Sequence, residues 1–306
     1  MAKSVARKHH YVSQAYLAAF TSSGTKDGQF FVLDVESGRA FRTTPGNVAA
    51  QRDFNRVDIE GHSPDVVENA LAPFEGNAID AIRRVVETQS FPSDSEWNLI
   101  LNLLALFAVR NPRLRESFNR SREQTLRIIG DMLASDKKLW DGHMQKAKEA
   151  GEQFPNVSFE EFKSFVERGN YKFEFHPEGN LRAEFNALDK VLPLLGQRIW
   201  SVLIAPPEGP EFICSDHPVT LVWKGAREGH VGYGLRETEV FFPIGRRVGF
   251  YGAYESPLKP VVTCRPLNVA IMNQRLVNSA ERQVYSAVKS FVVWYKGSIR
   301  EVCCEF

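Results

Sequence analysis

Residues 93–113, SDSEWNLILNLLALFAVRNPR, carry the signals that decide the helical part of the fold. Ser93 and Glu96 have the spacing of a capping box, in which two side chains satisfy backbone N–H groups at the start of a helix. The apolar run from Trp97 to Val109 is 13 residues long, too short to span a bilayer, and predicts a buried helix. Asn111-Pro112 ends that helix and begins the next one.

Further helices are expected on both sides of this segment. Ser63-Pro64 begins a helix that runs to about Glu87, with a kink or break expected at Pro73 because proline lacks a backbone N–H. The helices expected after Pro112 run to Ser135, from 136 to 150, and from the capping box of Ser158 and Glu161 to Glu167.

Strand-forming stretches lie toward the two ends of the chain. Residues 29–44, QFFVLDVESGRAFRTT, alternate between apolar and polar positions and predict a hairpin that turns at Glu36-Ser37-Gly38. The remaining expected elements are a short helix over 8–20, strands within 199–204, 212–223, 238–252 and 291–296, and a helix over 267–288.

The order of these elements predicts an α+β fold. We expect a helix-rich part over residues 60–180 and a strand-rich part over 181–306. A mixed, mainly C-terminal β-sheet is joined by the N-terminal hairpin. Because the hairpin and the sheet lie at opposite ends of the sequence, we expect one integrated domain over residues 1–306.

Composition narrows the class of protein. Among the 306 residues, 43% are apolar and 25% are charged, as in ordinary globular proteins. Lys and Arg number 38 and Asp and Glu 37, a net charge of +1 that excludes a histone-like nucleic-acid binder. The four cysteines have no metal-binding spacing, and the basic N-terminus is not followed by an apolar stretch. We expect a cytoplasmic protein without a membrane span.

Several motifs resemble one bacterial family. They are Lys8-His9-His10-Tyr11-Val12 followed by Tyr16-Leu17 and Phe20, Asn47-Val48-Ala49 with Arg52-Asp53-Phe54, Phe107 with Arg110-Asn111-Pro112-Arg113, and Ser215-Asp216-His217-Pro218-Val219. In these motifs the chain is similar to domain-of-unknown-function family 4238. Ser13 stands where that family usually has Pro, and His217 where Asn is common. The resemblance spans nearly the whole chain, and it implies a role in bacterial defence against phage with a nucleic acid as the target; the arginine stripe described below favours DNA as the partner.

Two adjacent histidines are the first candidates for catalysis. His9 and His10 offer imidazoles that can hold a phosphate or protonate a leaving group. Adjacent side chains diverge, so at most one of them faces a given ligand. The alternative is that one ring is buried in a hydrogen bond or caps a helix while the other is solvated.

Two carboxylates complete the catalytic candidates. Asp216 follows the apolar run 212–214 and precedes His217-Pro218, a position suited to a general base or to stabilising a positive transition state. The alternative is that Asp216 accepts backbone N–H groups in its own turn. Glu75, after Phe74, is the candidate for a second carboxylate at the same site.

Candidate substrate-binding residues come mainly from the middle of the chain. Arg110, Arg113, Arg120 and Arg127 fall within about 100° on one helical face. Such a stripe can follow a phosphate backbone, with Asn111 at the helix start; the alternative is a solvated face paired with acids from 68–87. The other candidates are Tyr11, Arg52, Phe54 and His217; Phe54 is expected either to stack on a base or to lie in the core.

These residues favour a hydrolase that acts on nucleic acid. The sequence has no P-loop, no GxGxxG after a strand, no HExxH and no GxSxG, so the enzyme classes that use those motifs lose support. We expect a DNA glycosylase without cofactor or metal, in which one carboxylate stabilises an oxocarbenium-like sugar. The alternatives are a metal-dependent nuclease with Asp216 and Glu75 as ligands, and a non-catalytic module that binds a nucleotide or a phage component.

Overall fold

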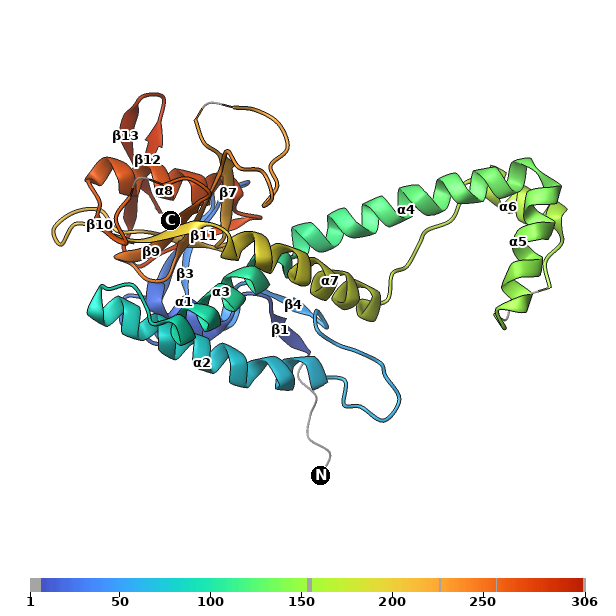
Figure 1. Ribbon diagram of the computed structural model, residues 1–306, viewed down its shortest axis with the longest axis horizontal. Helices are drawn as coiled ribbons and strands as arrows, with labels where there is room; N and C mark the ends of the chain where they lie inside the picture. Colours follow the sequence, from blue (N-terminus) through green and yellow to red (C-terminus); the bar gives the residue numbers. More distant parts are fainter. Residues whose placement is uncertain (1–6, 153–155, 226, 257, 305–306) are drawn as a thin grey trace.

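The computed structural model describes residues 7–152, 156–225, 227–256 and 258–304 (Figure 1). Its α-helices are α1 (Gln14–Leu17), α2 (Val66–Thr88), α3 (Asp94–Val109), α4 (Pro112–Ser135), α5 (Lys137–Glu149), α6 (Phe159–Arg168), α7 (Pro177–Gly196) and α8 (Pro266–Ser279). Its strands are β1 (Lys8–His10), β2 (Phe30–Asp34), β3 (Ala40–Thr43), β4 (Ala50–Arg52), β5 (Ile199–Ile204), β6 (Cys214–Ser215), β7 (Thr220–Trp223), β8 (Thr238–Pro243), β9 (Val248–Ala253), β10 (Val261–Thr263), β11 (Gln283–Ser286), β12 (Ser290–Tyr295) and β13 (Ser298–Cys303). The predicted α+β class is confirmed.

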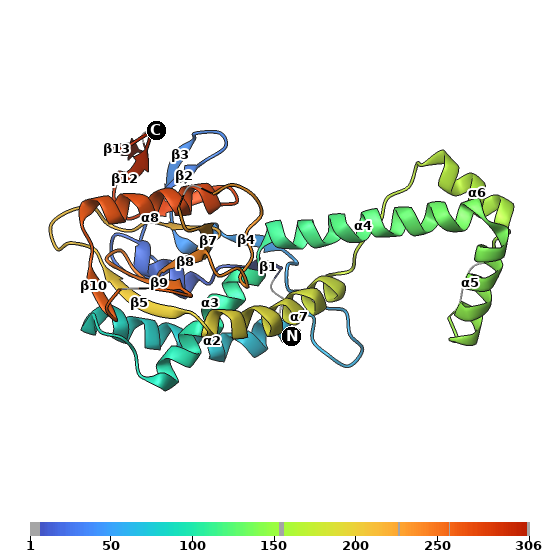
Figure 2. The ribbon, with the colours of Figure 1, turned by 45° about the horizontal axis from the view of Figure 1, so that its top comes forward.

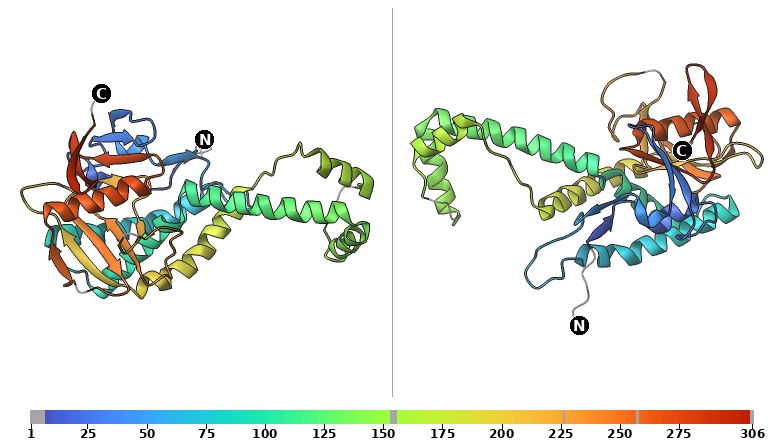
Figure 3. Two further views of the ribbon diagram at one scale, coloured as in Figure 1. Left: turned by 90° about the horizontal axis from the view of Figure 1, so that it is seen from above. Right: turned by 180° about the vertical axis from the view of Figure 1, so that it is seen from behind.

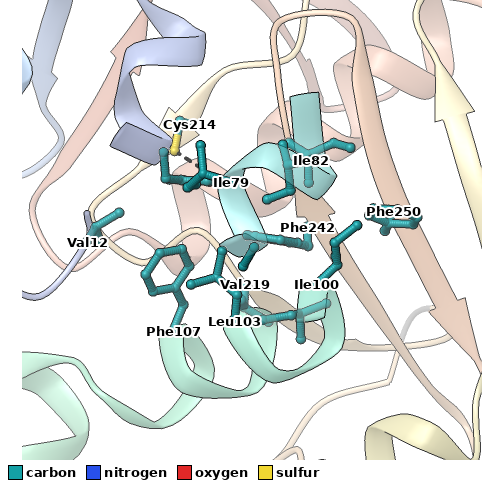
Figure 4. Packing of buried hydrophobic residues seen from close by; sticks show 14 of the residues in the cluster. Val12, Ile79, Ile82, Ile100, Leu103, Phe107, Cys214, Val219, Phe242 and Phe250 are labelled. Atoms are coloured by element: carbon teal, nitrogen blue, oxygen red, sulfur yellow. Dashed lines mark hydrogen bonds between the residues drawn. The ribbon is translucent and has the colours of Figure 1, made fainter. Parts of the chain in front are cut away.

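Helix α3 is the centre of the helical layer. The predicted capping box of Ser93 and Glu96 is present, and every residue from Leu103 to Val109 is buried. The helix is apolar on nearly all sides because α2 and α7 both pack against it. Figure 4 shows residues of α3 beside residues of α2 and of the sheet, among them Ile100, Leu103, Phe107, Ile79, Ile82, Phe242 and Phe250.

A five-stranded sheet, in the order β10-β5-β9-β8-β7, lies between two helical layers (Figure 2). The β10–β5 pair is parallel and the other pairs are antiparallel, so the sheet is mixed, as predicted. Side chains alternate across it: Val240 and Phe242 join the core made with α2 and α3, whereas Phe241 joins the core made with α8. Both faces of β8 are therefore buried.

The predicted hairpin of β2 and β3 joins a second sheet, in the order β3-β2-β11-β6. Gly38 in its turn has a φ of +70°, a backbone conformation that glycine adopts without strain. Val284 of β11 pairs with Leu33 on one side and with Ser215 on the other. The N-terminal hairpin is thus joined to the C-terminal part of the chain, as the sequence predicts.

A helical arm, residues 116–173, projects from the rest of the molecule, which we call the body (Figures 1 and 3). The arm consists of most of α4 together with α5 and α6. Trp140 and Phe162 stack inside it with ring centroids 4.3 Å apart. Other large apolar side chains of the arm are exposed: Leu126, Ile128, Ile129, Met132, Leu139, Val157 and Phe165. Among the helices that the structure describes, none combines the length and the apolar character needed to cross a membrane.

Three predicted elements differ from the structure. A helix was expected over 8–20, but β1 occupies the start of this segment because it pairs with β4, and only α1 and a 3-10 turn follow. Helix α2 begins at Val66 and continues through Pro73, so the expected break is absent; packing against α3 outweighs one lost hydrogen bond. Residues 283–286, expected within a helix, form β11 between β2 and β6.

Candidate functional site

The β1–β4 pair separates the two histidines of the N-terminal motif. His9 and His10 pair with Gln51 and Ala50 in an antiparallel register, so their side chains leave opposite faces of the ribbon. His9 is 2% exposed, and its Nδ1 accepts a hydrogen bond from the backbone N–H of Asn55 at 2.8 Å. The expectation of a catalytic His9 is therefore wrong: the ring is a buried anchor for the loop after β4.

His10 is the histidine that retains a chemical capacity. It is half-buried, and its Nδ1 has no hydrogen-bond partner among the described residues. Burial lowers the pKa of His10 and the charge of Lys8 lowers it further, while the backbone of Val48 and the charge of Glu68 act in the opposite direction. These effects together favour the neutral imidazole, whose unpaired Nδ1 offers a place for a proton.

Helix α2 presents two carboxylates to this region. Glu68 and Glu75 are seven residues apart, two helical turns, and so lie on one face of α2. Glu68 accepts a hydrogen bond from Nδ2 of Asn55. Burial and the negative charge of Glu68 raise the pKa of Glu75, against the opposing effects of Arg110 and of a hydrogen bond with Ser13. Glu75 therefore holds its proton to a higher pH than an exposed glutamate.

A buried ion-pair network lies beneath these groups. Arg110 is 3% exposed, and its Nη2 donates to Oδ1 of Asn55 at 2.7 Å. Arg115 donates to both carboxylate oxygens of Glu184, at 2.7 and 2.9 Å, and Arg110 lies 4.0 Å from the same carboxylate. Arg110 was expected to grip a phosphate at the rim of the site; it is instead a buried cation that attracts Glu68 and Glu75.

The aromatic residues near the network are part of the packing. Phe54 is 3% exposed, its ring lies 3.5 Å from the Arg115 guanidinium, and its carbonyl accepts from Arg115 Nη1. The expectation that Phe54 stacks on a base is wrong, and the alternative of a core aromatic is correct. Tyr11 packs beside Phe54, with ring centroids 5.6 Å apart, and is only half-buried. Tyr11 is thus the aromatic side chain next to His10 that remains partly exposed.

Asp216 occupies a backbone turn rather than an open site. It is 2% exposed, and its carboxylate accepts hydrogen bonds from the backbone N–H groups of Glu281, Arg282 and Gln283 at 2.8, 2.9 and 2.9 Å. Burial raises the pKa of Asp216 to about 6 although these three bonds act in the opposite direction. The expectation of a general base is contradicted, because both oxygens are engaged and shielded from solvent. Asp216 is a backbone acceptor, as in the alternative, but its donors lie at 281–283, at the start of β11, and not in its own turn.

The metal site that the nuclease alternative requires is also not supported by the structure. Among residues 7–152, 156–225, 227–256 and 258–304, no group of three or more His, Cys, Asp or Glu side chains is arranged to hold a metal ion. Asp216 and Glu75 were the expected ligands, and neither belongs to such a group.

The predicted arginine stripe is largely neutralised within α4. Arg120 pairs with Glu116 at 3.0 Å and Arg127 with Glu123 at 2.8 Å. The cationic surface beside His10 is built elsewhere, around Asp53: the charges of Arg7, Arg52 and Arg56 all act on this one carboxylate. Arg52, a predicted substrate-binding residue, is well exposed there.

Three other predicted binding residues meet around a cavity of about 500 Å³. Asn111 and Arg113 come from the start of α4, and His217 from the loop before β7. Asn111 is buried and caps α4, since its Oδ1 accepts from the backbone N–H of Leu114 at 2.8 Å. Arg113 is exposed. Neither His10 nor Glu75 lines this cavity, so the predicted site divides into two parts. One is this cavity, and the other is an acid–base cluster, made of His10, Ser13, Asn55, Glu68, Glu75, Arg110, Arg115 and Glu184.

Five residues of the cluster were not among the predicted site residues: Ser13, Asn55, Glu68, Arg115 and Glu184. The spacing of Glu68 and Glu75 on one helical face is a local signal that could have identified Glu68. Asn55 and Glu184 carry no such signal, because Arg110 and Arg115 reach them from positions more than 50 residues away in the sequence.

Comparison with known proteins gives a family and nothing further. Residues 8–290 match the family described as "Protein of unknown function (DUF4238)". No curated protein and no solved structure matches the chain.

Proposed function

This chain belongs to the DUF4238 family of proteins of unknown function, and since that description assigns no chemistry, we propose from the acid–base cluster that it is a hydrolase of the DNA glycosylase type. The proposed reaction cleaves the N-glycosidic bond between a base and its sugar. The mechanism expected from the sequence is kept, but its residues change: Glu75, Glu68 and His10 take the roles expected of Asp216 and His9.

One observation carries the proposal. The pKa of Glu75, half-buried on α2, is raised, and the pKa of His10, half-buried on β1, is lowered. The two shifts bring a carboxylic acid and a neutral imidazole toward the same pH range, which is what acid and base catalysts at neutral pH need. The negative charge of Glu68 acts on both groups and is what links them.

In the proposed reaction Glu75 donates its proton to the departing base as the C1′–N bond breaks. The bonding electrons leave with the base nitrogen, and the sugar develops positive charge. The negative charge of Glu68, held in place by Asn55, stabilises this oxocarbenium-like sugar. Water adds to C1′ and loses a proton to His10, so the products are a free base and an abasic sugar. Proton exchange with solvent then returns Glu75 and His10 to their starting states.

The surface beside His10 favours a polyanionic substrate. Arg7, Arg52 and Arg56 gather around the single carboxylate of Asp53, and Lys8 lies on the same strand pair. The excess of positive charge can hold the phosphates on either side of the target nucleotide. Tyr11, which follows His10 and is partly exposed, offers an aromatic ring for an extruded base.

The test compares Glu75→Gln with Glu87→Gln, the same change at an exposed position of α2. Each protein is incubated with unmodified DNA and with base-modified phage DNA, with and without EDTA, and the products are then treated with mild alkali. We expect alkali-dependent breaks that survive EDTA in the wild type and in Glu87→Gln. In Glu75→Gln the rate is expected to fall by about 10²- to 10⁴-fold, the usual contribution of a general acid.

The other outcomes separate the competing functions. Direct breaks that EDTA abolishes would indicate a metal-dependent nuclease. A Glu75→Gln rate equal to that of Glu87→Gln would remove Glu75 from the mechanism. No product from any DNA would favour a binding protein.

A further inference from the structure

The cavity at the start of α4 is lined by both polar and apolar side chains. Its volume of about 500 Å³ lies within the range of small-molecule sites. The apolar wall includes Leu114 of α4, Val219 and Leu221 next to and within β7, and the ring of Tyr233. Arg113, on the first turn of α4, is the charged side chain that lines it. A ligand that fits must therefore combine an apolar body with an anionic end.

His217 supplies the observation that points to a ligand. Its Nδ1 donates to the carbonyl oxygen of Ser279 at 3.1 Å, which leaves Nε2 as the atom available to another partner. Nε2 is buried, and it has no hydrogen-bond partner among the described residues. Because buried polar atoms are nearly always paired, an unpaired ring nitrogen at the wall of a cavity indicates a group that binds there.

The surrounding charge selects an anion. Arg113 is exposed and forms no salt bridge with any residue that the structure describes. Burial lowers the pKa of His217, and the positive charge of Arg113 lowers it further. The positive end of the α4 dipole points toward the same place, because Pro112 and Arg113 form its first turn. The other side chains that line this part of the cavity from α8 and β7 are uncharged, so no carboxylate opposes an anion there.

We propose that this cavity binds a nucleoside monophosphate, with the phosphate held by Arg113 and His217 and the base against Tyr233 and the apolar wall. One phosphate oxygen accepts a hydrogen bond from Arg113, and the P–OH group of the singly protonated phosphate donates one to the unprotonated Nε2 of His217. The planar base fits against the apolar wall, where an aromatic ring provides a stacking surface. The site goes beyond the proposed function, since neither Glu75 nor His10 lines it.

The experiment measures binding of adenosine 5′-monophosphate to the full-length protein by isothermal titration calorimetry. Adenosine and inorganic phosphate are titrated separately as the two halves of the ligand. Arg113→Gln is compared with Arg120→Gln, an exposed arginine of the same helix that does not line the cavity. His217→Phe removes the ring nitrogens while keeping a planar ring, and circular dichroism checks that it folds.

We expect the monophosphate to bind more tightly than either half. Arg113→Gln should weaken its binding by about 10- to 100-fold, the usual effect of losing one charge-assisted hydrogen bond, and Arg120→Gln should not. No detectable binding at millimolar concentration would overturn the proposal. So would equal affinities of Arg113→Gln and Arg120→Gln, or adenosine binding as tightly as the monophosphate. Glu75→Gln should bind the monophosphate like the wild type, which separates this result from failure of the proposed hydrolase.

Discussion

The body and the arm share helix α4, and the same type of ion pair occurs in both settings. In the body, Arg115 is bound by two hydrogen bonds to Glu184, whose side chain is 0% exposed. One turn further on, in the arm, Arg120 pairs with Glu116, and these side chains are 69% and 67% exposed. The comparison teaches that burial, and not the choice of residues, decides what an arginine–glutamate pair contributes to stability.

The largest expected effect comes from removing the buried carboxylate. Glu184→Ala leaves Arg115 and Arg110 buried without their common partner, so we expect the free energy of unfolding to fall by about 3–5 kcal/mol. Urea denaturation followed by circular dichroism measures it. Glu116→Ala, the matched change in the arm, should leave the midpoint nearly unchanged. Similar losses in the two variants would contradict the distinction between body and arm.

A buried leucine of the body and an exposed leucine of the arm can be compared in the same way. Leu104 on α3 is fully buried in the core shared with α2 and the sheet, whereas Leu126 on the arm is 40% exposed. Leu104→Ala should lower the free energy of unfolding by about 2–5 kcal/mol, because it leaves a cavity. Leu126→Ala should cost less than about 1 kcal/mol, since alanine favours helix and the site is open to water. A large loss for Leu126→Ala would show that the arm has a core of its own.

The smallest expected loss of stability concerns two aspartates whose side chains accept hydrogen bonds from backbone N–H groups, Asp216 in the body and Asp136 in the arm. Asp216→Asn replaces one acceptor oxygen by a donor among three backbone N–H groups, and we expect a loss of about 1–3 kcal/mol in stability. Asp136→Asn in the arm alters an exposed N-cap that accepts from Lys138, where Asn caps as well as Asp. The urea midpoint of Asp136→Asn should therefore equal that of the wild type. If the midpoint of Asp216→Asn were also unchanged, Asp216 would not have the structural role given to it.

The effect of Asp216→Asn on the free energy of unfolding is expected to depend on pH. In the folded protein the pKa of Asp216 rises from 3.8 to about 6, so between these values the folded state binds more proton than the unfolded state. Stability contributed by Asp216 therefore falls as pH rises through this window. The difference between wild type and Asp216→Asn should be larger at pH 4 than at pH 7. A difference that grows with pH would contradict the raised pKa.

Local signals predicted the elements of this fold well. The capping boxes of Ser93 with Glu96 and Ser158 with Glu161 appear at the starts of α3 and α6, and residues 199–204 form β5. These features depend on neighbours a few residues away. Residues 283–286 were misassigned because their strand exists only through pairing with β2 and β6.

The candidate site was predictable only in part. The sequence singled out His10, Glu75, Asn111, Arg113 and His217, which remain in the proposed sites, because polar side chains in those contexts are chemically distinctive. The sequence did not show which of these residues lie together. His9, next to His10, instead anchors the backbone of Asn55, and Asp216, next to His217, accepts a backbone N–H group from Glu281.

What the sequence by itself determined is therefore the set of helices and strands and the supply of ionisable groups. Only the tertiary structure decided which of those groups share a site and in which protonation state. Capping and periodicity act over one or two turns, whereas the burial that raises the pKa of Glu75 and lowers that of His10 comes from segments distant in the chain.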